Sequence, residues 1–443
     1  MASSPSTGLF ASAAEKRSFE YFQSHAAKCL GGMFNQTFWG REVLQAAIHY
    51  QPIRHLIIGL GAAYELFESS TYDGYHDSRA TEVASKFTLQ QCNNAIRQLA
   101  ALSPQSPATQ SLETVSCILT SSILFIYLAF IRGNMAEGIQ HVRSSIKLLQ
   151  TVDQSPFVSE TPFPIPLSHI RTLLNSSYGQ LRGMINDTAL EALNYDSLVS
   201  SIEPATIFYS IPDAHNYVER LTQNTLAFSQ FLLIHPATTD ARLEEVVARH
   251  GVLCRALISS QNALDQLSAS LGQQPEDKGI TMLRLHHTLT TIRLRLDVVL
   301  HPEQREVAFD ELESLLEEML EYCEIICESG SPRKPICSSG LGVIPPLHTI
   351  AARCRNPRIR RRAAGLLLEA QRKECLWDST LAGKVSLQTI EIEEEGWQGE
   401  RIEFEKRVWE VKIELQGERR ALLRFHKGGD GWEKGMVQRV ISW

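Results

Sequence analysis

The 443-residue sequence lacks the short motifs that mark the commonest kinds of catalytic site. It contains no glycine-rich dinucleotide-binding fingerprint, no phosphate-binding P-loop and no nucleophile elbow. No predicted helix carries two histidines four residues apart around a glutamate, the pattern that binds zinc in many proteases. A carboxylate or histidine in a pocket can still move protons without any motif. The sequence therefore names no catalytic residue, no cofactor-binding residue and no metal ligand.

An excess of positive charge is also missing, since 43 lysines and arginines face 50 acidic residues and the formal net charge is −7. Contact with nucleic acid would therefore need a local basic patch. Residues 353–373 form the one strong candidate, with Glu369 as their sole acid. This segment could bind phosphate or an acidic partner. We favour a second interpretation, in which the acidic residues 391–395 neutralise it within the fold, because no interleaved aromatic residues offer a stacking platform for bases. Its basic residues are Arg353, Arg355, Arg358, Arg360, Arg361, Arg362, Arg372 and Lys373.

No stretch of the sequence approaches the six clustered cysteines that a binuclear zinc cluster needs. The number of cysteines is odd and they are scattered, which argues against a disulfide framework and fits a reducing compartment. The nearest approach to a cluster is Cys323, Cys327 and Cys337, with Cys354 beyond. Cys323 and Cys327 lie one helical turn apart and could share a metal, but no histidine follows at the spacing of a zinc site. Ordinary buried thiols are the favoured interpretation. The nine cysteines are Cys29, Cys92, Cys117, Cys254, Cys323, Cys327, Cys337, Cys354 and Cys375.

The histidines form no chelating group either. His286 and His287 are neighbours in a predicted helix, where adjacent side chains point about 100° apart and cannot bind one ion together. His250 follows Glu244 and Glu245 on another predicted helix, and a solvated polar face is the favoured interpretation there.

Long apolar runs are rare, and the one to weigh as a membrane candidate is residues 114–131, eighteen residues without a charge. That length meets the simplest criterion for a membrane-spanning helix. Several serines and threonines dilute the run, and Glu113 and Arg132 close it. We therefore expect a buried core helix and no contact with a membrane. Residues 1–14 have no charged leader and no long apolar run, so they are expected to be a flexible leader rather than a signal peptide.

What the sequence does contain is helical periodicity, with apolar residues three or four positions apart along most of the chain. In the segment that Pro52 opens, Gly59 and Gly61 predict close approach by a neighbouring helix. The segments 112–131 and 135–150, joined by a short turn, are expected to pack as an antiparallel hairpin. Helices are predicted at residues 15–30, 37–49, 52–67, 80–102, 112–131, 135–150, 169–185, 187–201, 216–234, 240–271, 280–300, 303–328, 346–355 and 357–374.

The last part of the chain changes period. Apolar and charged residues alternate from Trp409 to Leu415, which predicts a strand with one buried face. A turn at residues 416–418, a return strand at 421–425 and a third strand at 436–443 are expected to follow. Loops or connectors are expected at 68–79, 103–111, 151–166 and 329–335. The predicted fold is mainly α, with stacked antiparallel helices in one large domain over residues 15–395. A small β-hairpin or three-stranded sheet is expected in the tail, residues 396–443.

Several blocks occur in an order that resembles the regulatory region of fungal binuclear zinc-cluster transcription factors. The resemblance covers residues 15–395, and no single block is diagnostic. In that family the zinc cluster and a linker precede the block that begins here at Glu15, and this sequence has no such cluster. The blocks are residues 17–25, 38–39, 52–62, 132–134, 141–149, 346–363, 376–379 and 390–394.

The resemblance implies a helical transcriptional regulator or co-regulator in the nucleus, with the cytoplasm as the alternative location. Because family members often control secondary-metabolite gene clusters, we expect that setting here. Without its own zinc cluster the chain is not expected to read DNA directly, and it would act through a DNA-binding partner or by self-association. A small-molecule effector between helices is also implied. The alternatives are an enzyme on the same scaffold, for which His286, His287 or His348 could supply a base, and a non-catalytic interaction scaffold.

Overall fold

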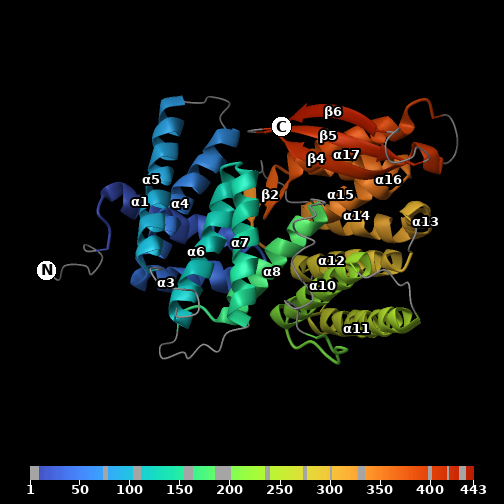
Figure 1. The fold of residues 1–443 in the computed structure, drawn as a ribbon, viewed down its shortest axis with the longest axis horizontal. Coiled ribbons are helices and arrows are strands. Elements are labelled where there is room, and N and C mark those ends of the chain that lie inside the picture. Colours follow the sequence, from blue (N-terminus) through green and yellow to red (C-terminus); the bar gives the residue numbers. More distant parts are fainter. Residues whose placement is uncertain are drawn as a thin grey trace. The chain divides into compact units, whose positions relative to one another are not determined.

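A computed structural model gives the fold of the chain (Figure 1). The described residues are 9–72, 78–102, 111–153, 163–184, 201–234, 240–272, 277–299, 302–327, 335–397, 402–416, 419–428 and 436–443. They divide between two compact units. Unit 1 comprises Met1–Leu181, Lys334–Gly340 and Lys373–Leu376, and unit 2 comprises Arg182–Arg333, Leu341–Arg372 and Trp377–Trp443. The expectation of one helical domain over residues 15–395 stays a prediction.

Unit 1 is a helical assembly in which α4 packs against α1, α3, α5 and α6. Two short π-helical turns, η2 and η3, interrupt the helices that the periodicity predicts at 15–30 and 37–49. Its elements are α1 (Ala13–Tyr21), η2 (Phe22–Ala26), α2 (Ala27–Gly31), η3 (Phe38–Glu42), α3 (Val43–His49), α4 (Gln51–Tyr72), α5 (Ser78–Leu102), α6 (Leu112–Ile131), α7 (Met135–Asp153), most of α8 (Leu167–Met184), and the strands β1 (Ile336–Ser338) and β2 (Arg372–Glu374).

Helix α6 is the long apolar helix, and among the described residues it is the one element long and apolar enough to cross a membrane. In its most apolar window, 83% of the residues are buried inside the protein. The helix therefore has the burial of a core helix, as the flanking charges and diluting hydroxyls predict. It forms the expected hairpin with α7, and Gly133 adopts a positive φ of 79° at the turn between them.

The two glycines of α4 differ in how closely a neighbour approaches. A Cβ atom at Gly61 would lie 2.1 Å from the backbone oxygen of Ser18 on α1 and 3.1 Å from the Phe22 Cβ. At Gly59 the nearest atom would be the Gln91 Cβ of α5, at 3.4 Å. The sequence predicts close packing at both positions, and the structure shows that Gly61 is the one at which no side chain fits.

We expect Gly61→Ala to lower the free energy of unfolding by about 1–3 kcal/mol, because the backbone of α1 must move away from α4. Gly59→Ala is the matched control. It should be neutral or stabilise by up to about 1 kcal/mol, since alanine favours a helix and meets no close contact. Urea denaturation of the two variants measures the difference. Equal losses in both would contradict the close approach at Gly61.

Unit 2 combines antiparallel helices with a small sheet. One of its hydrophobic clusters joins Phe228 of α10, Leu253 of α11 and Leu294 of α12. Its elements are α10 (Ile211–Ile234), α11 (Asp240–Ser270), α12 (Lys278–Asp297), α13 (Pro302–Ala308), the 3₁₀ turn η6 (Phe309–Leu312), α14 (Glu313–Cys327), α15 (Ile344–Arg353), α16 (Pro357–Glu369), β3 (Trp377–Asp378), α17 (Ser379–Glu394), the 3₁₀ turn η7 (Phe404–Lys406), β4 (Val408–Leu415), β5 (Arg420–Lys427) and β6 (Met436–Ser442).

The strands β4, β5 and β6 form an antiparallel sheet in that order (Figure 1). Helix α17 packs on this sheet, because Leu381 and Val385 share a buried cluster with Val408, Leu423 and Phe425. The register shifts once between Val408 and Glu410. The mainly helical fold with a small C-terminal three-stranded sheet is thus confirmed, and the alternation from Trp409 locates β4 correctly.

Two sequence-based boundaries are wrong. A loop was predicted to begin at Glu68, but helix α4 continues to Tyr72. Glu68 stays in the helix because its side chain is buried and accepts a hydrogen bond from the Tyr21 hydroxyl. The helix predicted over 357–374 ends at Glu369, where Gln371 adopts a positive φ of 44° and the chain enters β2. The prediction at 303–328 becomes α13, η6 and α14. Most of the helix predicted at 187–201 lies outside the described residues.

Candidate functional site

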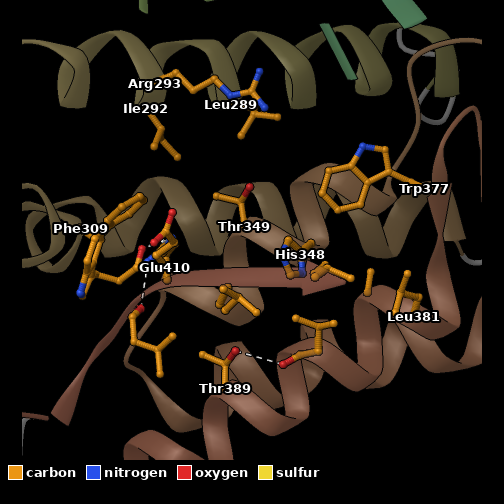
Figure 2. A pocket seen from close by; sticks show the side chains of 18 of the residues that line it. Leu289, Ile292, Arg293, Phe309, His348, Thr349, Trp377, Leu381, Thr389 and Glu410 are labelled. Carbon is orange, nitrogen blue, oxygen red and sulfur yellow. Dashed lines mark hydrogen bonds between the residues drawn. The ribbon is translucent and has the colours of Figure 1, made fainter. Parts of the chain in front are cut away.

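A cavity of about 380 Å³ lies within unit 2, bounded by α12, α15, α17 and β4. Figure 2 shows Leu289 and Ile292 on one side of it and Thr389 on the opposite side, with Phe309 and Trp377 towards its two ends. Most of its lining is aliphatic or aromatic. The remaining apolar lining residues are Leu296, Ala352, Leu381, Ala382, Val385, Val408, Trp409, Val411 and Ile413.

His348 brings an imidazole to the cavity wall from α15. Its Nδ1 lies 3.1 Å from the Ser386 hydroxyl oxygen on α17, and its ring lies beside that of Trp377 with the centroids 5.4 Å apart. Burial lowers the pKa of His348 to about 4, and the nearby charge of Arg353 acts in the same direction. The imidazole is therefore neutral at physiological pH, and it offers a hydrogen bond without adding charge.

Two arginines also line the cavity. Burial lowers the pKa of the Arg293 guanidinium, while Asp297 on the same helix acts in the opposite direction. An arginine remains charged even so, because its ordinary pKa lies far above neutrality. Arg353 donates to the Glu306 carboxylate at 2.6 Å and to the backbone oxygens of Val408 and Trp409 at 3.1 and 3.0 Å. It thereby ties α15 to β4 at the edge of the cavity.

The size and lining fit a small, largely apolar molecule with a few polar groups. Ligand pockets commonly have volumes of about 300–1,000 Å³ and mainly apolar walls with a few placed polar groups. Here those groups include the neutral His348, the charged Arg293, the Thr349 hydroxyl and the Glu410 carboxylate. Arg293 favours a ligand that carries an acidic or strongly hydrogen-bonding group.

Of the three histidines considered as bases, only His348 lines this cavity. His286 is 5% exposed, and its Nε2 lies 2.7 Å from the Gly342 carbonyl oxygen. His287 is 3% exposed and lies within hydrogen-bonding distance of the Ser260 hydroxyl and the Leu257 carbonyl. The two neighbours thus face different partners, as the 100° offset between adjacent helical residues predicts. His250 contacts Cys254 on its own helix.

Within the described residues, the cysteines considered for a metal do not form a group of three metal-binding donors. Cys323 and Cys327 are buried on α14 of unit 2, and Cys354 is buried where α15 ends. Cys337 belongs to unit 1, where its backbone N–H donates to the Tyr64 hydroxyl. Burial raises the pKa of Cys337 to about 12 and that of Cys354 to about 11. These two thiols therefore stay protonated and inert at neutral pH.

The basic segment is largely paired with carboxylates of unit 2. Arg360 of α16 is fully buried and donates to Glu393 at 2.7 Å, and Arg355 donates to the same carboxylate at 3.1 Å. The acidic residues 391–395 therefore neutralise part of the segment within the fold. The further pairs are Arg355 with Glu306, Arg358 with Glu317, Arg361 with Glu394, and Arg362 with Glu324.

Sequence reasoning missed most of the cavity, including Arg293, Trp377 and Glu410. These residues come from segments far apart in the chain, and no spacing links them. The nearest signal was the position of Trp377 and His348 within blocks that carry the family resemblance.

The chain has few recognisable relatives in the comparisons. No family model matches it, and no solved structure matches it significantly. Among curated proteins it is similar to the "Aspercryptin biosynthesis cluster-specific transcription regulator atnN" of Emericella nidulans, with 22% identity over 465 aligned residues. The alignment covers 86% of this chain and 73% of that protein. Along most of its length, the chain is therefore distantly similar to a cluster-specific transcription regulator.

Proposed function

We propose that this protein regulates transcription of a secondary-metabolite gene cluster in the nucleus and acts through partner proteins. The observation that carries the proposal is the similarity to a cluster-specific transcription regulator over 86% of the chain. The helical fold is compatible with the regulatory region of such proteins, although fold alone does not fix function. Because no stretch of this sequence holds the six clustered cysteines of a binuclear zinc cluster, we assign DNA contact to a partner that carries its own DNA-binding domain.

The cavity of unit 2 provides a chemical input for this role. A ligand that prefers one conformation of a regulator shifts its population towards that conformation. Since α12, α15, α17 and β4 all line the cavity, a bound molecule would fix their packing against one another. We assign this site to a small, largely apolar effector with an acidic group facing Arg293, such as a product or intermediate of the regulated pathway.

Deletion of the gene in the native host tests the regulatory role. Transcripts of the neighbouring genes and the metabolite should fall together, because loss of a regulator acts before any enzyme of the pathway is made. The measurement is transcript and metabolite profiling of the same cultures. Steady transcripts with an accumulating intermediate would refute regulation and favour the alternative of a catalytic step on this scaffold.

Complementation of the deletion strain tests the effector site. Ala352 of α15 lines the cavity, so Ala352→Phe should fill it. We expect the variant protein to reach the normal cellular level. Addition of the metabolite should then no longer change the transcript levels of the neighbouring genes. Ala248→Phe, at an exposed position on α11, is the matched control and should restore the normal response. An unchanged response in the Ala352 variant would refute the assignment of the cavity.

A further inference from the structure

Three side chains with metal-binding atoms converge in unit 1, and none of them lines the cavity. The His25 Nε2 atom lies 2.6 Å from the Glu68 Oε1 atom and 3.9 Å from the Cys29 Sγ atom. All three donor atoms lie within 4.8 Å of one another. Among the described residues, this is the one group of three such donors at that separation.

Local helix geometry brings the first two together. His25 and Cys29 are four residues apart on the continuous run of α1, η2 and α2, so their side chains share one face. His25 belongs to the π-helical turn η2, and π-turns inside α-helices occur frequently at functional sites. Glu68 comes from the last part of α4, which packs against η2.

The donor set selects the kind of ion. A thiolate and an imidazole are ligands that zinc favours, whereas magnesium and calcium favour oxygen donors. A carboxylate is a common third zinc ligand, and three protein ligands leave one position open for water in sites that are not purely structural. We propose that His25, Cys29 and Glu68 bind a zinc ion, with an open fourth position.

The site is accessible to an ion. The His25 side chain is 37% exposed and that of Glu68 is 9% exposed, and Cys29 is half-buried while the cysteines other than Cys254 are buried. Zinc bonds of about 2.0–2.3 Å place neighbouring ligand atoms about 3–4 Å apart. The Cys29–His25 separation already fits that range, and the carboxylate must move outward by a few tenths of an ångström.

Binding also requires the ligand atoms to be free of protons. The thiol of Cys29 releases its proton to solvent, and the His25 ring binds through Nε2 in the tautomer that carries its proton on Nδ1. A neutral imidazole and two anionic ligands then surround the ion. Zinc affinity should therefore rise with pH.

Tyr21 holds the carboxylate in place. Its hydroxyl donates to the Glu68 Oε2 atom at 2.7 Å, and burial together with this hydrogen bond raises the pKa of Tyr21. The phenol therefore stays protonated and orients the oxygen that faces away from the ion. Hydrogen bonds of this kind to a metal ligand typically change metal affinity by about 10–100-fold.

A second pair in the same chain provides a matched comparison. His250 and Cys254 on α11 have the same residue types and spacing, with the Sγ atom 3.6–3.7 Å from the ring nitrogens. The Cys254 thiol is also half-buried. Among the described residues, however, no carboxylate completes this pair into a group of three at metal-binding separation.

Titration of the reduced full-length protein with zinc, and with cobalt as a spectroscopic substitute, tests the proposal. We expect one equivalent to bind, with a thiolate-to-cobalt charge-transfer band and the d–d intensity of a tetrahedral ion. Cys29→Ser should remove that band and the tight equivalent, and Cys254→Ser should leave both unchanged. Tyr21→Phe should keep the band and weaken zinc binding by about 10–100-fold.

Three results would overturn the proposal. They are the absence of a bound equivalent in the wild-type protein, a cobalt spectrum without the thiolate band, and retention of tight binding by the Cys29 variant. Circular dichroism of each variant establishes that the helical fold is intact. Because the readout is metal binding and its spectrum, it is independent of whether the protein regulates transcription.

Discussion

Replacing Glu393 by glutamine is expected to lower the free energy of unfolding by about 3–5 kcal/mol, the usual cost of removing one partner from a buried ion pair. The Glu393 and Arg360 side chains are both fully buried. Glu393 also accepts hydrogen bonds from Arg355 at 3.1 Å and from the backbone N–H of Val408 at 2.8 Å. A neutral amide would leave the buried guanidinium of Arg360 with only the Glu394 carboxylate, at 3.8 Å, as a nearby opposite charge.

An exposed ion pair that also involves an arginine of α16 provides the control. Arg358 of α16 pairs with Glu317, and these side chains are 72% and 40% exposed. Because water screens such a pair, Glu317→Gln should change the free energy of unfolding by less than about 1 kcal/mol. Urea denaturation of both variants at the same pH gives the comparison. Similar small effects would mean that the carboxylate of Glu393 is not needed to hold Arg360 in the core.

The pairing of the basic segment, residues 353–373, could be predicted only in part from the sequence. Opposite charge and proximity in sequence were enough to predict that residues 391–395 could neutralise residues 353–373. They could not indicate that Arg360 is the arginine taken into the core, because that depends on how α16 packs against α17. Charge composition is local information, whereas burial of one particular side chain is set by the tertiary fold.

The same distinction separates the predicted and the missed elements. Strand β4 was found because alternation of apolar and charged residues is visible within eight residues. Strand β2 was missed because its three residues, Arg372–Glu374, are all charged and show no alternation of apolar and polar side chains. The left-handed conformation of Gln371, which follows the end of the helix, carries no glycine to mark it in the sequence. The backbone bond from Cys375 to Ser338, which fixes the chain beyond that point, joins residues far apart in sequence.

The two candidate sites differ in the same way. The cavity depends on four segments that meet only in the folded unit, so periodicity cannot reveal it. At the proposed zinc site, the spacing of His25 and Cys29 was visible in the sequence. This spacing alone does not predict a metal site, because it recurs at His250 and Cys254. Glu68, which distinguishes the two pairs, was assigned to a loop.

Acidification is expected to destabilise unit 2 well before most carboxylates are protonated. Burial lowers the pKa values of His286 and His348 to about 4 each, against an ordinary value of about 6.5. Between these values the unfolded chain binds more protons than the folded one, so stability is full above about pH 6.5 and is lost as the pH falls towards 4. Each histidine contributes at most about 3.4 kcal/mol over that range.

His286 should account for the larger share, because it is 5% exposed whereas His348 faces the cavity. The nearby charge of Arg293 also opposes protonation of His286. Unfolding free energies measured from pH 8 to pH 5 should show His286→Gln flattening the acid slope by about 1.4 kcal/mol per pH unit. The difference in unfolding free energy between this variant and the wild-type protein at pH 8 gives the packing cost alone, since histidine is neutral there. An unchanged slope in this variant would mean that the imidazole is protonated in the folded protein. The hydrogen bond to the Gly342 carbonyl would then have compensated for burial.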